Sequence, residues 1–140
     1  GIDISTVAIE VAKINADVHH ATVQFEEMDF LIKPYNKKFD MIISNPPYIP
    51  LIEMNSLMYD VRLFEPHFAL SDGADGLLFY QGFAGVAPTM INSGGHLILE
   101  VGLNGHPNRA LEVFDKSSFY DQTLIPDRNG DPRVLKVTVD

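Results

Sequence analysis

The chain has 140 residues and a formal net charge of −9 with histidine neutral; hydrophobic residues make up 46% of it and charged residues 21%. These proportions are typical of a folded domain and exclude a disordered tail. No apolar run approaches the roughly 20 residues that a bilayer-spanning helix needs. Because the sequence contains no cysteine, it excludes disulfides, thiolate zinc sites and cysteine nucleophiles. The acidic charge disfavours nucleic-acid binding, which depends on Lys and Arg at the phosphates.

The start of the chain predicts a strand, a helix and a second strand. Ile2 to Ile4 is typical of the end of a strand, and Ser5 is a good N-cap for a helix that runs to about residue 16. Residues 21–25 are rich in β-formers and predict a short strand. The chain begins with Gly1 and shows no signal peptide, so we expect it to begin inside a fold.

The middle of the chain contains the most apolar predicted strand. Residues 39–44 form a near-continuous apolar run, which is typical of a strand buried on both faces of a parallel sheet. The strand ends at Asn45-Pro46-Pro47-Tyr48, since proline cannot donate to a β-ladder. Residues 49–75 show no clear period, and a segment of that length is usually functional or mobile.

The remaining sequence completes an alternation of strands and helices. The expected elements are a helix over 76–91 that Pro88 kinks or shortens, a turn at 92–95, a strand over 96–101, a helix opened by Pro107, and strands over 119–125 and 134–139 joined by a turn at 127–131. The last two strands can pair as a hairpin. The order therefore predicts one α/β domain with a mostly parallel sheet and an antiparallel edge.

The strongest functional signal is the tetrapeptide that follows the apolar strand, because ligands of open α/β sheets bind beyond the carboxyl ends of the strands. The side-chain oxygen of Asn45 and a nearby backbone carbonyl can accept both hydrogens of one planar NH₂ group. The ring of Tyr48 can cover that flat group. The alternative is that the tetrapeptide is only a rigid turn.

Two acidic positions follow the first two predicted strands. Asp3 can accept hydrogen bonds from ribose hydroxyls, as acids at such strand ends do in nucleotide-binding sheets; the alternative is that it caps the following helix. Asp29-Phe30 can offer an amine acceptor beside an apolar wall, or it can be an ordinary surface loop. Taken singly, each position favours a structural role.

The order of these segments resembles the HemK/PrmC family, whose members are S-adenosylmethionine-dependent methyltransferases that modify a glutamine side chain of peptide-chain release factors. The resemblance also depends on Glu65-Pro66, Ser71 to Gly76, Gly94-Gly95 and Leu97 to Gly102. It implies a Rossmann-like class I methyltransferase sheet, mostly parallel, with an antiparallel C-terminal hairpin. The turn at Asp131-Pro132-Arg133 differs from the family pattern, because Pro132 separates the acid from the arginine, and its role stays open.

The resemblance implies S-adenosylmethionine as the cofactor. Its ribose would be bound by Asp3, its adenine by Asp29 and Phe30, and Asn45 would lie against it as well. Asn45 and Pro46 would be the catalytic residues, holding the glutamine amide nitrogen. Substrate binding would also involve Pro47, which shapes the loop, and Tyr48, which packs over the substrate.

The resemblance further implies that residues 1–140 are the C-terminal part of a methyltransferase catalytic domain, without the first strand and glycine-rich cofactor loop of the family. That strand would lie between the strands ending at Asp3 and Asn45, and its absence would leave backbone groups unpaired. We therefore expect weak cofactor binding and little or no turnover. We also expect self-association through the unpaired strands.

The implied partner is a peptide-chain release factor in the cytoplasm, with no membrane and no metal; the five histidines show no ligand spacing. Two alternatives stay open. The Asn-Pro-Pro-Tyr tetrapeptide also occurs in methyltransferases of exocyclic amines of nucleic-acid bases, although the charge of −9 disfavours that substrate. The chain could instead be a non-enzymatic remnant that acts as an interaction module.

Overall fold

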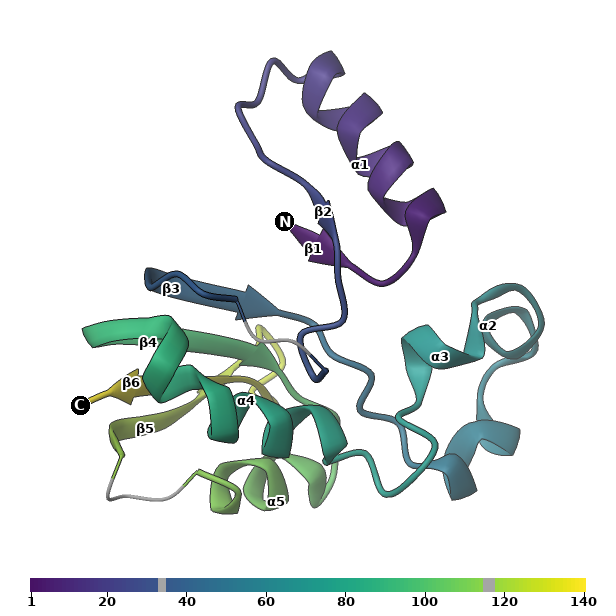
Figure 1. The fold of residues 1–140 in the computed structure, drawn as a ribbon. Helices are drawn as coiled ribbons and strands as arrows, with labels where there is room; N and C mark the ends of the chain where they lie inside the picture. The colour runs from purple at the N-terminus through teal and green to yellow at the C-terminus, as the bar shows by residue number, and fades with distance from the viewer. Residues whose placement is uncertain (33–34, 115–117) are drawn as a thin grey trace. The chain divides into compact units, whose positions relative to one another are not determined.

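The computed structural model describes residues 1–32, 35–114 and 118–140 (Figure 1). Its contacts divide the chain into two compact units, Gly1–Tyr35 (unit 1) and Asn36–Asp140 (unit 2). The described strands form one sheet of two strands and a second sheet of four. Sequence patterns had indicated no boundary at residue 35, and the assignment of residues 1–140 to one catalytic domain stays a prediction.

Unit 1 is a strand, a helix and a strand. The strands β1 (Ile2–Asp3) and β2 (Glu26–Glu27) pair in parallel, and the helix α1 (Thr6–Val18) connects them. The predicted cap is confirmed, since the Ser5 hydroxyl accepts a hydrogen bond of 3.2 Å from the amide of Ala8. The helix extends two residues beyond the predicted end.

The strand predicted over residues 21–25 is wrong. Those residues have no regular structure, and the strand consists of Glu26 and Glu27 instead. The partner strand β1 consists of Ile2 and Asp3 only. The ladder therefore has two residue pairs, Ile2 with Glu26 and Asp3 with Glu27. The extent of β2 is thus set by its partner and not by its own β-propensity.

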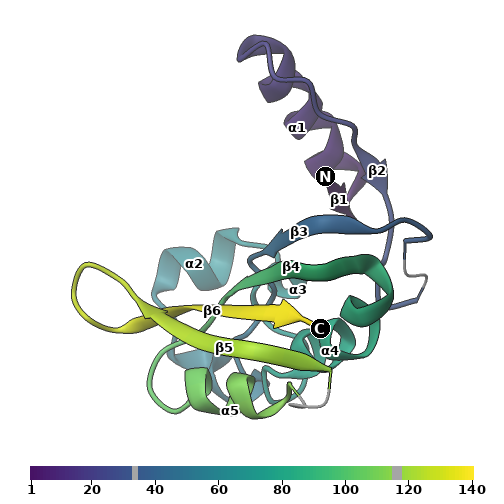
Figure 2. The ribbon, with the colours of Figure 1, turned by 90° about the vertical axis from the view of Figure 1, so that its left-hand side faces the viewer.

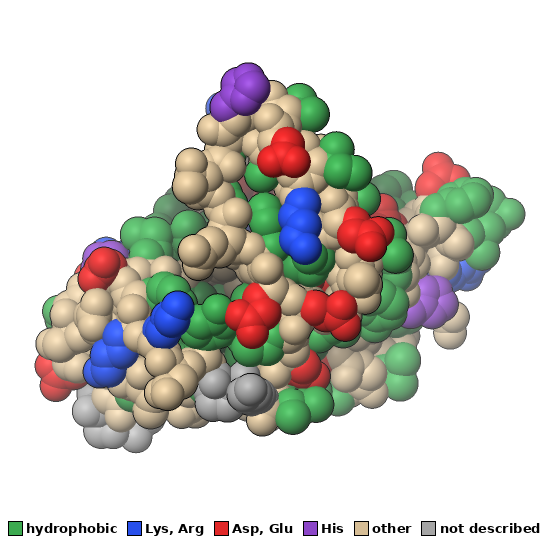
Figure 3. All heavy atoms as spheres, turned by 45° about the horizontal axis from the view of Figure 1, so that its top comes forward, with side chains coloured by type: hydrophobic (Ala, Val, Ile, Leu, Met, Phe, Trp, Pro, Cys, Tyr) green, Lys and Arg blue, Asp and Glu red, His purple; other side chains and the backbone are tan. Residues whose placement is uncertain are grey.

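The apolar face of α1 is largely uncovered. Ile9, 5% exposed, is the helix's one buried residue among those described. The exposed apolar residues of the helix are Val7, Val11, Ile14 and Val18. Figure 3 shows hydrophobic side chains at the molecular surface between acidic ones.

Unit 2 has a four-stranded sheet in the order β3-β4-β6-β5 (Figure 2). Its strands are β3 (Phe39–Ser44), β4 (Ile91–Glu100), β5 (Phe119–Pro126) and β6 (Pro132–Val139). The pair β3–β4 is parallel, and β6 runs antiparallel to both β4 and β5. The predicted C-terminal hairpin and the predicted α/β class are therefore confirmed, and the sheet that was predicted to be mostly parallel contains both parallel and antiparallel pairs.

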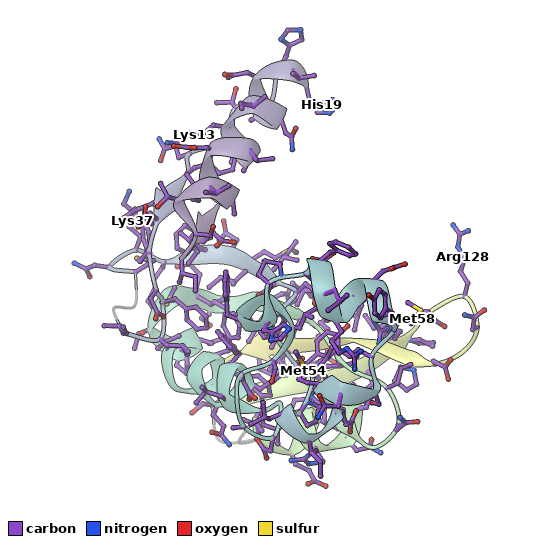
Figure 4. All side chains as sticks on the ribbon, turned by 90° about the vertical axis from the view of Figure 1, so that its right-hand side faces the viewer. Lys13, His19, Lys37, Met54, Met58 and Arg128 are labelled. Carbon is purple, nitrogen blue, oxygen red and sulfur yellow. The ribbon has the colours of Figure 1, made fainter. Side chains whose placement is uncertain are left out.

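The helical elements of unit 2 follow β3 and β4. They are the 3₁₀ helix η1 (Leu51–Ser56) and the helices α2 (Tyr59–Phe64), α3 (His67–Leu70), α4 (Leu78–Met90) and α5 (His106–Glu112). The helix α4 packs on β4, and α5 packs on β5 and β6. The aperiodic segment 49–75 thus contains three short helical turns, and Figure 4 shows Met54 and Met58 on it. Met54 is buried, whereas Met58 is exposed.

The core of unit 2 lies between this sheet and α4 and α5. Pro88 does not stop α4, which continues to Met90. The side chains that are fully buried and largest are Tyr80, Ile91, Leu97, Leu99, Leu135, Val101 and Val137. These residues come from α4, β4, β6 and the segment after β4, so the core does not depend on unit 1.

The prediction that residues 39–44 are buried on both faces is wrong. Within the described residues, β3 is an edge strand that pairs only with β4. Phe39, Met41 and Ile43 are 37%, 49% and 71% exposed. The apolar run predicts the strand correctly, but burial depends on elements that cover both faces of the sheet, and the face that carries these three residues is left exposed.

The turn predicted at residues 92–95 becomes a bulge inside β4. Phe39 pairs with Ile91 and Met41 pairs with His96, so four residues of β4 are accommodated opposite one residue of β3. The Asn92 side chain donates a hydrogen bond of 2.9 Å to Asp40 across this bulge. Gly94 has a positive φ of 76° there, which glycine adopts at little cost.

None of the helices in the described part of the chain is both long and apolar enough to cross a membrane.

Candidate active site

In unit 1, the predicted cofactor residues lie at one edge of the two-stranded sheet. Asp3 ends β1, and Asp29 follows β2 by two residues, so both lie at the carboxyl ends of neighbouring parallel strands. The Met28 amide donates a hydrogen bond of 2.9 Å to the Asp3 carbonyl, which ties the two segments together. Unit 1 therefore brings Asp3, Asp29 and Phe30 to the same sheet edge.

Each of these two carboxylates stabilises its own turn through one oxygen. Asp3 Oδ1 accepts a hydrogen bond of 2.8 Å from the Ser5 amide, and Asp29 Oδ1 accepts one of 2.9 Å from the Leu31 amide. Asp3 therefore stabilises the turn that leads into α1, whose N-cap is Ser5. Within the described residues the second oxygen of each carboxylate has no hydrogen-bond partner. These oxygens can accept a hydroxyl or amine proton from a ligand.

In unit 2, the predicted substrate residues follow β3 directly. Asn45 is exposed, Pro46 is buried, and Pro47 and Tyr48 are half-buried. The Asn45 side chain makes no hydrogen bond to the described residues, and neither does the carbonyl oxygen of Pro46. The loop therefore presents two unused acceptors, one of them on an exposed side chain and the other on a backbone whose φ angles are fixed by proline.

The Tyr48 side chain is fixed by two charged residues. Its hydroxyl donates to Glu100 Oε1 at 2.9 Å and accepts from Arg133 Nη2 at 3.2 Å, and the same arginine nitrogen lies 2.7 Å from Glu100 Oε1. The Arg133 guanidinium carbon also lies 5.8 Å from the centroid of the Tyr48 ring. The three side chains form a closed network beside the loop.

This network alters the protonation equilibria of its members. Burial, assisted by Glu100, raises the pKa of the Tyr48 phenol above its usual value, against the opposing hydrogen bond from Arg133. Burial acts to lower the pKa of the Arg133 guanidinium, but the hydrogen bond to Tyr48 and the charge of Glu100 raise it overall. Burial also raises the pKa of Tyr80, whose hydroxyl donates to the Glu100 carbonyl at 2.6 Å. Tyr48 and Tyr80 are therefore neutral at pH 7, and neither is a ready general base.

The buried imidazole of His106 packs beside Tyr48, the last residue of the Asn45–Tyr48 loop. Gly102 N donates to His106 Nδ1 at 3.1 Å, so the proton of the neutral ring is on Nε2, which lies 3.0 Å from the Gly76 carbonyl oxygen. Burial lowers the pKa of His106 and favours this neutral form. The ring centroids of His106 and Tyr48 are 5.8 Å apart.

The backbone approaches the loop closely at two glycines. A Cβ at Gly76, whose φ is +86°, would clash with the Tyr48 carbonyl oxygen. A Cβ at Gly102 would lie 3.2 Å from the Tyr48 ring and 3.1 Å from His106 Cγ. A larger residue at Gly76 would therefore force the Tyr48 backbone to shift, whereas one at Gly102 would press more mildly on the side chains of Tyr48 and His106.

Sequence reasoning missed Glu100, a member of this network, and His106, whose ring lies beside that of Tyr48, and it left the role of Arg133 open. Glu100 ends a buried apolar run, which was the available signal for an acid at the carboxyl end of a strand. His106 carried no local signal, because its partners Gly76 and Gly102 are brought to it only by the fold. Among the described residues, no three His, Cys, Asp or Glu side chains gather closely enough to hold a metal ion.

Comparisons with known proteins agree with the resemblance in the sequence. Residues 1–65 match the family model of the methyltransferase small domain. A release factor glutamine methyltransferase from Geobacter sulfurreducens is 38% identical over 135 residues, which cover 96% of this chain and 47% of the relative. The protein of the same name from Bacillus subtilis is 42% identical over 104 residues, covering 72% of this chain and 36% of the relative.

Solved structures show the same fold. A methyltransferase from Pyrococcus furiosus matches 99% of this chain and 60% of its own, with a TM-score of 0.69 and 18% identity. The N-methyltransferase NodS from Bradyrhizobium japonicum, in complex with S-adenosyl-L-homocysteine, matches 99% of this chain and 64% of its own, with a TM-score of 0.57 and 12% identity. The predicted class I methyltransferase fold is thereby confirmed.

Nearly all of this chain matches the curated relatives, but it spans only about half of their length. By sequence it is similar to the release factor glutamine methyltransferases over nearly all of its length, and its fold is that of the class I methyltransferases.

Proposed function

We propose that this chain belongs to an enzyme that transfers a methyl group from S-adenosylmethionine to the side-chain amide nitrogen of a glutamine in a peptide-chain release factor. The observation that carries the proposal is the loop after β3, where the exposed Asn45 side chain and the Pro46 carbonyl are unused acceptors on a firmly held backbone. The relatives named release factor glutamine methyltransferase support the choice of substrate.

The loop fits an amide nitrogen because that group is flat and carries two hydrogens. Asn45 Oδ1 would accept one hydrogen and the Pro46 carbonyl oxygen the other, which fixes the plane of the NH₂ group. Orientation of this kind can contribute roughly 7–11 kcal/mol to lowering a reaction barrier. The two acceptors also stabilise the positive charge that develops on the nitrogen as its lone pair forms the new bond to carbon.

The residues of unit 1 fit the proposed cofactor. One free oxygen on each of Asp3 and Asp29 can accept hydrogen bonds from ribose hydroxyls and from the adenine amine, respectively, and Phe30 supplies an apolar ring. When bound, S-adenosylmethionine supplies an activated methyl group on a sulfonium sulfur. The amide nitrogen held by Asn45 and Pro46 would accept this methyl group and lose one of its two protons to solvent, and sulfur would keep the electrons of the broken carbon–sulfur bond.

We further propose that residues 1–140 alone bind the cofactor weakly and turn over little. They would form the C-terminal part of a methyltransferase catalytic domain, and their cofactor residues lie on a ladder of only two residue pairs with most of α1 uncovered. Titration calorimetry of this polypeptide with S-adenosylmethionine tests this proposal, and binding in the micromolar range would contradict it. Light scattering tests for the accompanying self-association at the exposed edge of β3.

A methyl-transfer assay tests the function, using the natural protein that carries these residues and methyl-labelled S-adenosylmethionine. We expect label in a release factor and none in a release factor whose glutamine is replaced by glutamate, which has no NH₂ group to hold. Duplex DNA and RNA serve as competing substrates. Label on their bases, and none on the release factor, would overturn the proposal in favour of base methylation. A release-factor substrate would place the reaction in the cytoplasm.

A further inference from the structure

The charged partners of Tyr48 are held by the sheet itself. Glu100 is the last residue of β4, and Arg133 is the second residue of β6. Because β6 runs antiparallel to β4, the start of one strand lies beside the end of the other, and the Val101 amide donates a hydrogen bond of 3.0 Å to the Arg133 carbonyl. Glu100 and Arg133 therefore form a fixed frame, whereas Tyr48 belongs to a loop.

The Glu100–Arg133 ion pair is more protected from solvent than the Asp75–Arg109 ion pair of the same unit. Its side chains are 34% and 26% exposed, compared with 57% and 46% for Asp75 and Arg109. Partial burial strengthens such a pair and makes a lost partner costly. The Tyr48 hydroxyl takes part in this pair by bonding to both of its members.

The link from Tyr48 back to the amide-binding loop is short and stiff. Only Pro46 and Pro47 separate Tyr48 from Asn45, and each proline fixes its own φ. On the other side of the loop, the Ile49 amide donates a hydrogen bond of 3.0 Å to the Leu70 carbonyl. Few backbone torsions are therefore free between Tyr48 and Asn45.

We infer that the Glu100–Arg133 pair is a positioning device that acts through the Tyr48 hydroxyl to hold Asn45 and Pro46 against the substrate amide. The inference deepens the proposed function and rests on it for the identity of the substrate. Glu100 and Arg133 are positioning residues, because they lie beside the loop and act through Tyr48. The Tyr48 hydroxyl anchors the loop independently of any contact that its ring makes with substrate.

The kinetic test removes the hydroxyl without removing the ring. In the natural protein that carries these residues, we expect Tyr48→Phe and Arg133→Gln each to lower kcat about tenfold or more, since small misplacements of reacting groups have large costs. KM for the release factor should change less than kcat. Because both variants break one network, the double variant should lose little more than the worse single variant, and Arg133→Lys should recover part of the activity.

Two matched controls lie in the same unit. Tyr120→Phe removes a hydroxyl for which the described residues offer no hydrogen-bond partner. Arg128→Gln removes a charge at the tip of the β5–β6 hairpin, where Figure 4 shows the side chain pointing away from the body of the molecule. Both controls should retain full activity. Thermal melts establish that every variant is folded at the assay temperature.

A second readout does not depend on activity. In the ¹⁵N-labelled chain, the Asn45 backbone and side-chain amides should become more mobile on the nanosecond timescale in Tyr48→Phe and Arg133→Gln, but not in the two controls. Unchanged Asn45 mobility in both network variants would overturn the inference, as would additive losses of kcat. Increased Asn45 mobility in the two network variants, together with a wild-type protein that methylates no release factor, would refute the proposed function and retain the positioning role.

Discussion

The helices α1 and α4 each have 13 residues and similar amphipathic patterns, yet the two units cover them differently. The helix α1 of unit 1 buries Ile9 alone, whereas α4 of unit 2 buries Tyr80, Phe83, Ala87 and Met90. An amphipathic pattern identifies the helix face that is apolar, but whether that face is buried depends on the elements that pack against it. Unit 2 has a core of its own, and unit 1 leaves most of its apolar face to solvent.

The largest difference between the two units should be the loss of unfolding free energy when an isoleucine is replaced by alanine in each of them. Ile91 is fully buried in unit 2, and Ile14 is 62% exposed in unit 1. We expect Ile91→Ala to lower the free energy of unfolding by about 2–5 kcal/mol and Ile14→Ala to change it by about 0.5 kcal/mol or less. Urea denaturation followed by circular dichroism measures both. Equal losses would show that unit 1 has a core as well packed as that of unit 2.

The loss of a side chain that accepts backbone amides next to a helix should also be larger in unit 2 than in unit 1. In unit 2, Asp72 accepts hydrogen bonds from the amides of Ala74, Gly76 and Leu78. In unit 1, the side chain of Ser5 accepts one hydrogen bond, at the start of α1. We expect Asp72→Ala to cost about 2 kcal/mol and Ser5→Ala about 1 kcal/mol or less, with the second loss confined to fraying of α1.

Hydrogen exchange locates these losses. Asp72→Ala should speed exchange in the loop before α4, and Ser5→Ala should speed it only in the first turn of α1. Asp72→Asn keeps one acceptor oxygen and should recover part of the stability. If Ser5→Ala destabilised unit 2 as well, the two units would not be energetically separate.

The smallest expected effect is the contribution of His106 to the pH dependence of the unfolding free energy of unit 2. Burial lowers the folded-state pKa of His106 below 6.5; Arg109 also lowers it, and Asp72 and Asp75 raise it without reversing the shift. As the pH falls below about 6.5, the unfolded state takes up the proton first. The stability that His106 contributes is thus complete above pH 6.5 and is lost as the pH falls through the folded-state pKa.

The substitution His106→Gln should reduce the loss of unfolding free energy between pH 7 and pH 5, as measured by urea denaturation at each pH. The substitution His19→Gln, at the exposed end of α1, is the matched control and should leave the loss unchanged. A wild-type pH profile identical to that of the His106 variant would contradict the lowering of the His106 pKa by burial.

Features formed by residues that are close in the sequence were predicted correctly, whereas features that depend on distant parts of the chain were not. The cap at Ser5 and the hairpin turn around Asp127 were predictable, because the residues that form them are neighbours; Asp127 Oδ1 accepts from the amides of Asn129 and Asp131. The position of β2 and the exposure of β3 were not predictable from the segments alone. Both depend on which strands are available to pair with them.

The candidate site shows the same division. Asn45 and Pro46 stood out because a rigid Pro-Pro segment after an apolar strand is a local pattern. The network at Tyr48 did not, since its other two members lie 52 and 85 residues further along the chain. Only the sheet order β3-β4-β6 brings these residues together.

The central claim is that Asn45 and Pro46 hold one NH₂ group for methyl transfer, and the most direct measurement is the methylation rate after Asn45→Ala. In the natural protein that carries these residues, kcat/KM for a release factor should fall by about 10²-fold or more. The control Asn129→Ala, in the hairpin turn, should leave it unchanged. A fully active Asn45→Ala variant would contradict the claim.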